Sequence, residues 1–180
     1  MKIVAVFTAL LMATITPVAI AGEDAFHAGK LIPDFGKIAT IDSDVAIPSG
    51  TVMQVSFDVA KQAEEGAVNR NLASAARFLN MHVEAGMAPK DLKLAIVVHG
   101  GASKDLLSNA AYKKRFGAES ANAALMRELM KHGVEIILCG QSAAYHDLAK
   151  DDLEPGVKMA LSAMTAHALL QQDGYTLNPF

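Results

Sequence analysis

Two short and almost uninterrupted runs of apolar residues constrain the fold of this chain more than any other feature. They are residues 92–98 (LKLAIVV) and residues 134–138 (VEIIL). Runs of this length, rich in Val, Ile and Leu, are typical of strands that are buried on both faces of a parallel sheet. Parallel neighbours need a crossover connection, which is usually a helix. The two runs therefore predict a parallel sheet with helices packed on it.

The rest of the chain alternates between strand and helix patterns. Residues 51–59 alternate apolar and polar side chains, which predicts a strand with one covered face. Apolar residues at helical spacing predict helices over 69–85 and 120–132, each followed by a glycine. The remaining expected elements are a short helix with a loop over 103–117, a short helix over 141–148, a short strand over 157–161, a helix over 163–172 and an edge strand over 175–177. The predicted fold is α/β, a three-layer sandwich with a mostly parallel, about five-stranded sheet and helices on both faces.

The first 21 residues have the pattern of a secretory signal peptide. Lys2 gives a basic start, residues 3–15 form an apolar run of about 13 residues, and positions 19–21 (AIA) match the small-x-small pattern of a cleavage site. The run is shorter than the roughly 20 residues of a membrane helix, so an uncleaved anchor is the less favoured alternative. We expect cleavage after Ala21, a periplasmic location and no membrane attachment of the mature protein.

The remaining chain divides into an N-terminal arm and one domain. Residues 22–50 carry Gly, Pro, Asp and Ser throughout, and only residues 35–41 resemble a short strand. We expect this arm to lie on the domain or on a neighbouring subunit, with a loosely ordered leader as the alternative. Residues 51–180 contain the whole alternating pattern and are expected to form one α/β domain.

Composition excludes several classes of protein. A hydrophobic content of 52% with 19% charged residues is incompatible with a disordered chain. A net charge of -3 supplies no basic field for nucleic acid. The single cysteine excludes an intramolecular disulfide and a zinc site with several thiolates. We therefore expect no metal, no cofactor and no nucleic-acid partner.

The predicted topology places four polar residues at one edge of the sheet. Ligands of an open parallel sheet bind outside the carboxyl ends of its strands. The four expected buried strands end at or beside Asp58, His99, Cys139 and Ser162. These residues are therefore the first candidates for a functional site.

Cys139 is the strongest of these candidates. It follows a buried strand and precedes the expected helix start at Gly140, Gln141 and Ser142. A thiol in this position faces free backbone N–H groups and the positive end of the helix dipole, and both stabilise the thiolate. Gly140 would let a substrate approach the backbone closely. The alternative is an inert buried thiol, because cysteine is among the most buried residue types.

Histidines supply the next candidates. His99 can act as a base, as a partner of the thiolate or as a donor to a bound anion, and its alternative is a strand-end histidine that bonds only to backbone. His146 and His167 are expected on the surface or in packing contacts. A zinc site from Cys139, His99 and His146 matches no standard ligand spacing.

Glycines and hydroxyls at the strand ends complete the set. Gly100 and Gly101 follow a strand, as in a phosphate-binding turn, but neither G-x-G-x-x-G nor the P-loop pattern is present. Ser142 and Ser162 lack the nucleophile-elbow motif, so both are assigned to substrate binding rather than to attack on a substrate. A nucleotide or other small-molecule pocket at the strand ends is the weaker alternative.

Residues 133–144 (GVEIILCGQSAA) resemble the cysteine segment of the DsrE/DsrF-like family. Residues 92–100 and 160–175 resemble two further segments, so the resemblance covers about 51–180. It implies a compact α/β fold with a parallel sheet, commonly assembled into homo- or hetero-oligomers. The best understood members are sulfur-relay proteins, which carry sulfane sulfur as a persulfide on a cysteine at the start of a helix after the third strand. The resemblance gives that role to Cys139.

The combined expectation is a periplasmic sulfur-binding or sulfur-transfer protein, sulfurtransferase-like in its chemistry, that carries a persulfide on one cysteine. Cys139 and His99 would be the catalytic residues, with His99 assisting proton transfer. The expected substrate-binding residues are Gly100, Gly140, Gln141, Ser142 and Ser162. The expected partners are a sulfane-sulfur donor, a thiol acceptor and further copies of the chain.

Two features separate this chain from the cytoplasmic relay proteins of that family. The signal peptide and the arm are absent from those members, so the partner of this protein must differ from theirs. The alternative function is a non-catalytic, oligomeric interaction or small-ligand-binding module in which Cys139 is buried and inert.

Overall fold

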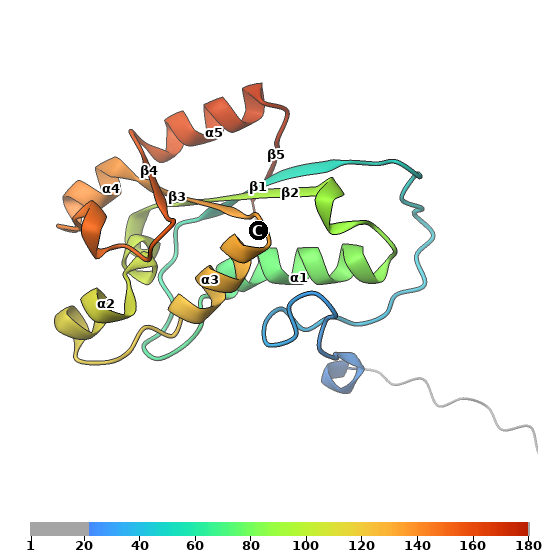
Figure 1. Ribbon diagram of the computed structural model, residues 1–180, viewed down its shortest axis with the longest axis horizontal. Helices are drawn as coiled ribbons and strands as arrows, with labels where there is room; N and C mark the ends of the chain where they lie inside the picture. The colour runs from blue at the N-terminus through green and yellow to red at the C-terminus, as the bar shows by residue number, and fades with distance from the viewer. Residues whose placement is uncertain (1–21, 180) are drawn as a thin grey trace, which may run out of the picture.

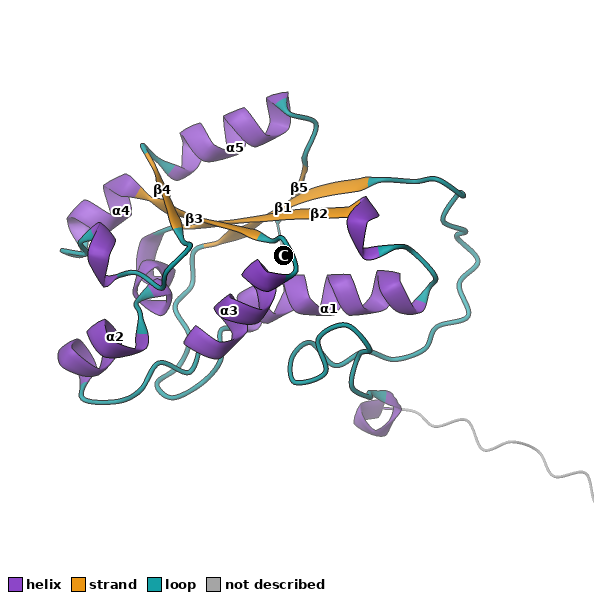
Figure 2. Cartoon of the chain, viewed as in Figure 1, coloured by secondary structure: helices purple, strands orange, loops and turns teal. Residues whose placement is uncertain are grey.

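The computed structural model describes residues 22–179 (Figures 1 and 2). The expected signal peptide lies outside the described residues, so its presence and its cleavage after Ala21 stay predictions. In the described part of the chain, no helix is long and apolar enough to cross a membrane.

Five strands form one sheet in the order β4-β3-β2-β1-β5, and every neighbouring pair is parallel. The strands are β1 (Met53–Val59), β2 (Leu92–Val98), β3 (Glu135–Cys139), β4 (Lys158–Ala160) and β5 (Thr176–Asn178). The two apolar runs of the sequence are β2 and β3, which lie in the middle of the sheet. The predicted parallel sheet of about five strands is therefore confirmed.

Helices cover both faces of this sheet (Figure 2), and α1 and α3 lie on the face opposite to α5. The α-helices of the described chain are α1 (Arg70–Glu84), α2 (Asn109–Phe116), α3 (Ala123–Lys131), α4 (Gly140–Tyr145) and α5 (Ala163–Gln172). Short 3-10 helices occur at Gly22–Ala25, Pro89–Asp91, Gly100–Leu106 and Lys150–Asp152. The arrangement is the predicted three-layer sandwich.

The main crossover helix, α1, shows why the sequence folds in this way. The Asn69 side chain accepts hydrogen bonds from the backbone N–H groups of Asn71 and Leu72 and caps the first turn. Four apolar residues at helical spacing are buried against the sheet: Leu72, Ala75, Ala76 and Leu79. Gly86 follows the helix with a φ of 94°, a conformation that favours glycine.

The two faces of the sheet are packed differently. The face under α1 and α3 holds the larger core, with Phe57, Leu94 and Ile96 almost fully buried. The face under α5 holds a smaller cluster built on Ala95, Val97, Ala166 and Leu170. Ile137 and Tyr175, which are partly buried, pack against this smaller cluster.

The arm lies on the domain, against α1. Ile32 and Ile38 are buried, and the Asn80 side chain of α1 accepts from the N–H of Ile32 and donates to three arm carbonyls, at residues 32, 35 and 36. The strand expected over residues 35–41 is wrong, because only an isolated bridge between residues 27 and 38 forms. Gly36 has a φ of 66°, which interrupts extended backbone.

Candidate functional site

The carboxyl ends of four parallel strands meet at one edge of the sheet, where the chain leaves towards α4 and the 3-10 helix after β2 (Figure 1). Asp58 is the penultimate residue of β1, His99 follows β2, Cys139 ends β3, and Ser162 lies two residues beyond β4. All four are at the edge that the topology predicts.

Cys139 is both the last residue of β3 and the residue before the first turn of α4. Its thiol is free, and the residue is 5% exposed. Burial, the largest single influence, raises the pKa of this thiol. Hydrogen bonds from the Ser142 hydroxyl and from the backbone N–H groups of Ser142, Ala163 and Gln141 outweigh burial, so the pKa lies below its ordinary value. We call these hydrogen-bond donors to the Cys139 sulfur the sulfur donor set.

The donor set belongs to two helices and not to one. Gln141 and Ser142 are in the first turn of α4, whereas Ala163 is the first residue of α5. The sulfur of Cys139 therefore lies between two helix N-termini, whose N–H groups favour a negative charge. This arrangement suits a thiolate better than a neutral thiol.

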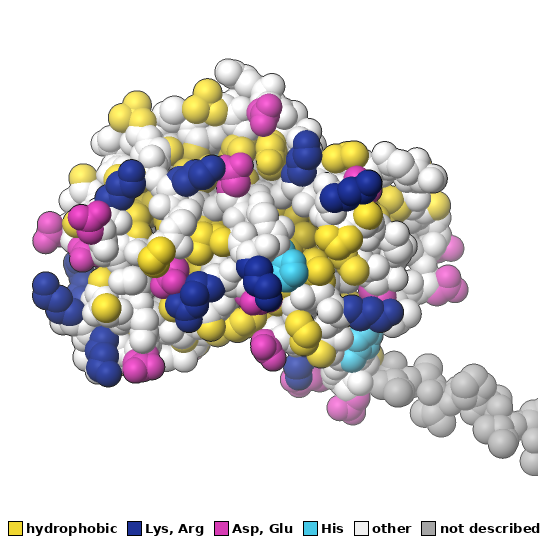
Figure 3. All heavy atoms as spheres, viewed as in Figure 1, with side chains coloured by type: hydrophobic (Ala, Val, Ile, Leu, Met, Phe, Trp, Pro, Cys, Tyr) yellow, Lys and Arg dark blue, Asp and Glu magenta, His cyan; other side chains and the backbone are white. Residues whose placement is uncertain are grey.

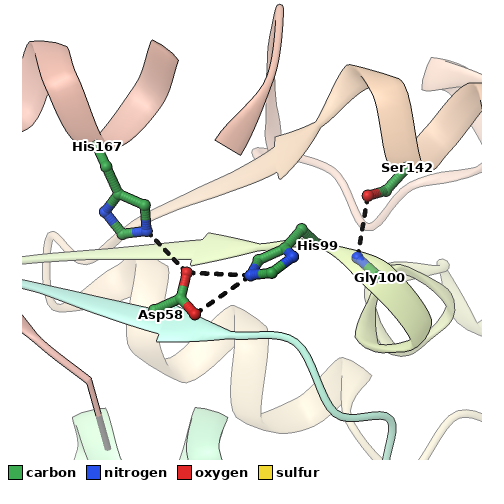
Figure 4. A network of polar contacts seen from close by, with 5 residues as sticks. All are labelled: Asp58, His99, Gly100, Ser142 and His167. Atoms are coloured by element: carbon green, nitrogen blue, oxygen red, sulfur yellow. Dashed lines mark hydrogen bonds and ion pairs between the residues drawn. The ribbon is translucent and has the colours of Figure 1, made fainter. Parts of the chain in front are cut away.

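Ser142 connects the sulfur to the end of β2. Its hydroxyl oxygen accepts a hydrogen bond of 2.9 Å from the N–H of Gly100 (Figure 4). With that lone pair in use, the hydroxyl proton is available to the sulfur of Cys139. Gly100 has a φ of 54°, which favours glycine and lets its N–H face Ser142.

Beside this set lies a cluster of three titratable side chains: Asp58, His99 and His167, here called the Asp58 cluster (Figure 4). The Nε2 atom of His99 is 3.1 Å and 3.2 Å from the two carboxylate oxygens of Asp58. The Nε2 atom of His167 is 2.9 Å from Oδ1 of the same carboxylate. Each imidazole donates Nε2–H, because an ionised carboxylate only accepts.

The carboxylate of Asp58 is kept ionised by its two histidines. Burial raises its pKa, but the hydrogen bonds and charges of His167 and His99 outweigh that effect, so the pKa is lowered. When one of these imidazoles is in its neutral form, donation through Nε2 leaves its Nδ1 atom as a hydrogen-bond acceptor. In His99 this nitrogen faces the side of Gly100 and Ser142 (Figure 4).

His167 is the residue that sequence reasoning missed. The sequence predicted a surface or packing position, but its side chain is only 15% exposed and bonds to Asp58. Within residues 22–179, its buried Nδ1 atom has no hydrogen-bond partner. One sequence signal pointed here: alternation along β1 puts Asp58 on the face that α5 covers, and His167 is one turn beyond the helix start.

Several expected contacts are absent from the described residues. No hydrogen bond joins His99 to Cys139, because His99 bonds to Asp58 instead. No three His, Cys, Asp or Glu side chains between residues 22 and 179 form a group that could hold a metal ion. The zinc site considered for Cys139, His99 and His146 therefore has no support in the structure.

Three residues expected to bind substrate have internal contacts. The Ser162 hydroxyl caps α5 by accepting from the N–H of Thr165, and the Gln141 side chain donates to the carbonyl of Leu161. A side chain on Gly140 would lie 2.7 Å from the carbonyl oxygen of Ala160. The absence of a side chain at Gly140 therefore lets the end of β4 approach α4 closely, and the role of Gly140 in substrate binding stays a prediction.

Comparison with models of known protein families identifies the family of this chain. The model of the DsrE/DsrF-like family matches residues 54–179. The chain belongs to the DsrE/DsrF-like family. The resemblance predicted from residues 133–144 is thus confirmed, and the family is often linked to sulfur relay.

No curated protein matches the chain. A solved structure of a protein of unknown function from Methanobacterium thermoautotrophicum is similar to it, with a TM-score of 0.54 and 17% sequence identity. The similarity covers 71% of this chain and 99% of that chain. At this identity the similarity supports the α/β fold with its parallel sheet, and nothing about function.

Proposed function

We propose that this protein is a sulfur-transfer protein that carries sulfane sulfur as a persulfide on Cys139. The observation that supports it most is the sulfur donor set, which lowers the pKa of the Cys139 thiol although the residue is buried. The thiolate is the form that attacks sulfur. The same N–H groups would stabilise the negative charge of a bound persulfide.

The proposed reaction has two steps. The Cys139 thiolate attacks a sulfane sulfur of the donor, the donor's S–S bond breaks, and the electron pair leaves with the donor's remaining sulfur. An acceptor thiolate then attacks the outer sulfur, the new S–S bond breaks, and Cys139 leaves as a thiolate. Sulfur moves as a neutral atom, so neither step needs an external oxidant or reductant.

His99 is the proposed proton carrier for the second step. Its Nε2–H is held by Asp58, which leaves Nδ1 to accept the proton of the acceptor thiol and to return it to the product persulfide. Asp58 has here the role that a buried carboxylate has beside a catalytic histidine elsewhere, which is to fix the tautomer and the ring.

The single cysteine decides the class of partner. With no second thiol in the chain, the acceptor must be a thiol of another molecule. The signal-peptide pattern of residues 1–21 supports a periplasmic setting, in which donor and acceptor would be periplasmic molecules. The acceptor differs in this respect from a cytoplasmic relay partner.

Mass spectrometry after incubation with polysulfide or thiosulfate tests the proposal. The wild type should gain about 32 Da, one sulfur atom, on the peptide that contains Cys139. Cys139→Ala should gain nothing, and prior alkylation of the wild type should block the gain. No gain on the wild type, or an equal gain on Cys139→Ala, would refute the persulfide function.

The alternative, a non-catalytic oligomeric module, is favoured by a different observation. Around α4 and α5, four large apolar side chains are exposed: Tyr145 by 85%, Leu161 by 72%, Met164 by 80% and Leu169 by 61%. Figure 3 shows separate apolar side chains on the surface at the α5 side of the molecule. The carbonyl oxygen of Leu161 accepts a hydrogen bond from the Gln141 side chain and would lie 3.2 Å from a Cβ atom added to Gly140. Because Gly140 follows Cys139 directly, this surface borders the cysteine.

We propose that this surface binds a second copy of the chain, as the family resemblance implies. Light scattering coupled to gel filtration should give a mass above that of one chain for the wild type, and Met164→Glu should lower it. A monomeric wild type would contradict the proposal. Oligomers together with a Cys139 that resists alkylation in the native state would favour the non-catalytic module.

A further inference from the structure

The sulfur donor set depends on two backbone segments that come from outside β3 and α4. One segment is the start of α5, where the N–H of Ala163 donates to the sulfur of Cys139. The other is the end of β2, where the N–H of Gly100 fixes the hydroxyl of Ser142, the side chain that donates to the same sulfur. Any shift of either segment removes a donor from the sulfur.

One carboxylate contacts both segments. Asp58 is bonded to His167, which lies one helical turn after Ala163 on α5. It is also bonded to His99, the residue immediately before Gly100. β1 is not a neighbour of β3, because β2 lies between them. The hydrogen bonds to the two histidines therefore connect the carboxylate to the segments that flank the sulfur site.

We propose that Asp58 is a positioning residue for Cys139, which holds the start of α5 and the end of β2 in place through His167 and His99. This inference rests on the proposed function only in taking the Cys139 sulfur as the reacting atom. The packing of α5 explains the need for such a contact. The apolar contacts beneath this helix are non-directional, so a hydrogen bond from His167 to the sheet adds a directional constraint that they lack.

Asp58 could act on Cys139 through its negative charge or by positioning the hydrogen-bond donors. These two roles predict opposite changes in the pKa of the Cys139 thiol when Asp58 is replaced. If Asp58 acted on the sulfur mainly through its charge, removing the charge would make the Cys139 thiolate easier to form. If Asp58 holds the donors, removing it loosens them, burial dominates, and the thiolate becomes harder to form. The hydrogen bonds of Asp58 to His99 and His167 favour the second outcome.

The test is the rate of alkylation of Cys139 by iodoacetamide as a function of pH, in the full chain and in Asp58→Asn. Asparagine keeps the size of the side chain but loses the charge and one acceptor. We expect the alkylation rate at neutral pH to fall about tenfold, which corresponds to a rise of about one unit in the pKa of the thiol. An unchanged or faster rate would overturn the proposal.

Single-segment variants and a matched control complete the design. His167→Gln should slow alkylation through the α5 segment alone, and His99→Gln through the β2 segment alone, each by less than Asp58→Asn. His167→Gln also tests the proposal if Asp58→Asn does not fold. Glu84→Gln is the control, because Glu84 also faces a histidine, His27 at 3.5 Å, but on the arm side of α1. It should leave the rate unchanged.

Two further outcomes separate positioning from other roles. Asp58→Glu keeps the carboxylate and should restore part of the rate, which a loss caused by general destabilisation would not show. A lower melting temperature in Asp58→Asn with an unchanged thiol pKa would assign Asp58 to stability alone and refute positioning. A wild type that takes up no sulfur would refute the persulfide function and leave the comparison of thiol pKa values intact.

Discussion

The two polar groups at the carboxyl edge of the sheet differ in what holds them. The sulfur of Cys139 is surrounded by a hydroxyl and by backbone N–H groups, none of which changes its charge with pH. The Asp58 cluster is built only of groups that titrate, and its carboxylate is about one-third exposed. A fixed set of donors suits the storage of a negative charge, whereas a titratable set suits the movement of protons. In the function that we propose, the first region would store sulfur, and the second would handle protons and position the first.

Among the variants that test this difference between the two regions, Gly140→Ala should have the largest effect. An added Cβ at Gly140 would meet the carbonyl oxygen of Ala160 at 2.7 Å, so α4 must move away from β4. We expect a loss of about 1–3 kcal/mol in the free energy of unfolding, together with slower alkylation of Cys139. Denaturant unfolding measures the first and iodoacetamide kinetics the second.

Gly101→Ala is the matched control for this variant. A Cβ at Gly101 would meet the side chain of Gln62 at an ordinary distance of 3.5 Å, so little loss of stability is expected. If both variants lost the same free energy of unfolding, the contact between α4 and β4 would not explain the effect at Gly140.

The next effect should come from Ser142→Ala. This change removes the hydroxyl that donates to the sulfur and leaves the N–H of Gly100 without its acceptor. Hydrogen bonds to charged groups contribute about 1.5–3 kcal/mol, so alkylation at neutral pH should fall by about tenfold or more. Ser74→Ala, which removes an exposed hydroxyl of α1, should leave the rate as it is. A wild-type rate in Ser142→Ala would show that the backbone N–H groups alone stabilise the thiolate.

His99→Gln should separate the two steps of sulfur transfer. Glutamine has no basic nitrogen, so release of sulfur to an acceptor thiol should slow by about 10²-fold or more. Uptake of sulfur from the donor should fall less, because in the proposed reaction the Cys139 thiolate attacks the donor without a proton transfer to His99. Single-turnover assays of the two half-reactions, followed by mass spectrometry, measure both. Equal losses in uptake and release would remove the proton-carrying role from His99.

The smallest effect concerns stability against pH. The pKa of Asp58 is lower in the folded protein than in the unfolded chain, so the carboxylate stabilises the fold above its unfolded pKa, and this contribution is lost as the pH falls through the folded pKa. Between neutral pH and about pH 3, the melting temperature of the wild type should therefore fall further than that of Asp58→Asn. Parallel melting curves would contradict this linkage.

The sequence predicts the Cys139 site better than the Asp58 cluster, for a physical reason. Cys139 and the residues that follow it lie in one continuous segment, so a buried strand followed by a glycine was enough to indicate a thiol at a helix start. The bond between Asp58 and His167 joins residues 109 positions apart and depends on which face α5 covers. No local pattern carries that information.

Contacts between distant segments also determine two local features that the sequence pattern does not show. Residues 35–41 resemble a strand, yet the Asn80 side chain takes up the backbone groups of the arm, and Gly36 has a positive φ. Gly140 was assigned to the approach of a substrate, but β4 fills the adjacent space. In both cases the structure depends on a contact between distant segments, which the local pattern does not show.

The pH dependence of Cys139 alkylation in the wild-type protein tests the central claim most directly. A sulfur held by the donors of α4 and α5 should react with a midpoint below the ordinary thiol pKa of about 8.5. A midpoint at or above that value, with slow reaction throughout, would contradict the account and show that Cys139 is a buried, inert cysteine.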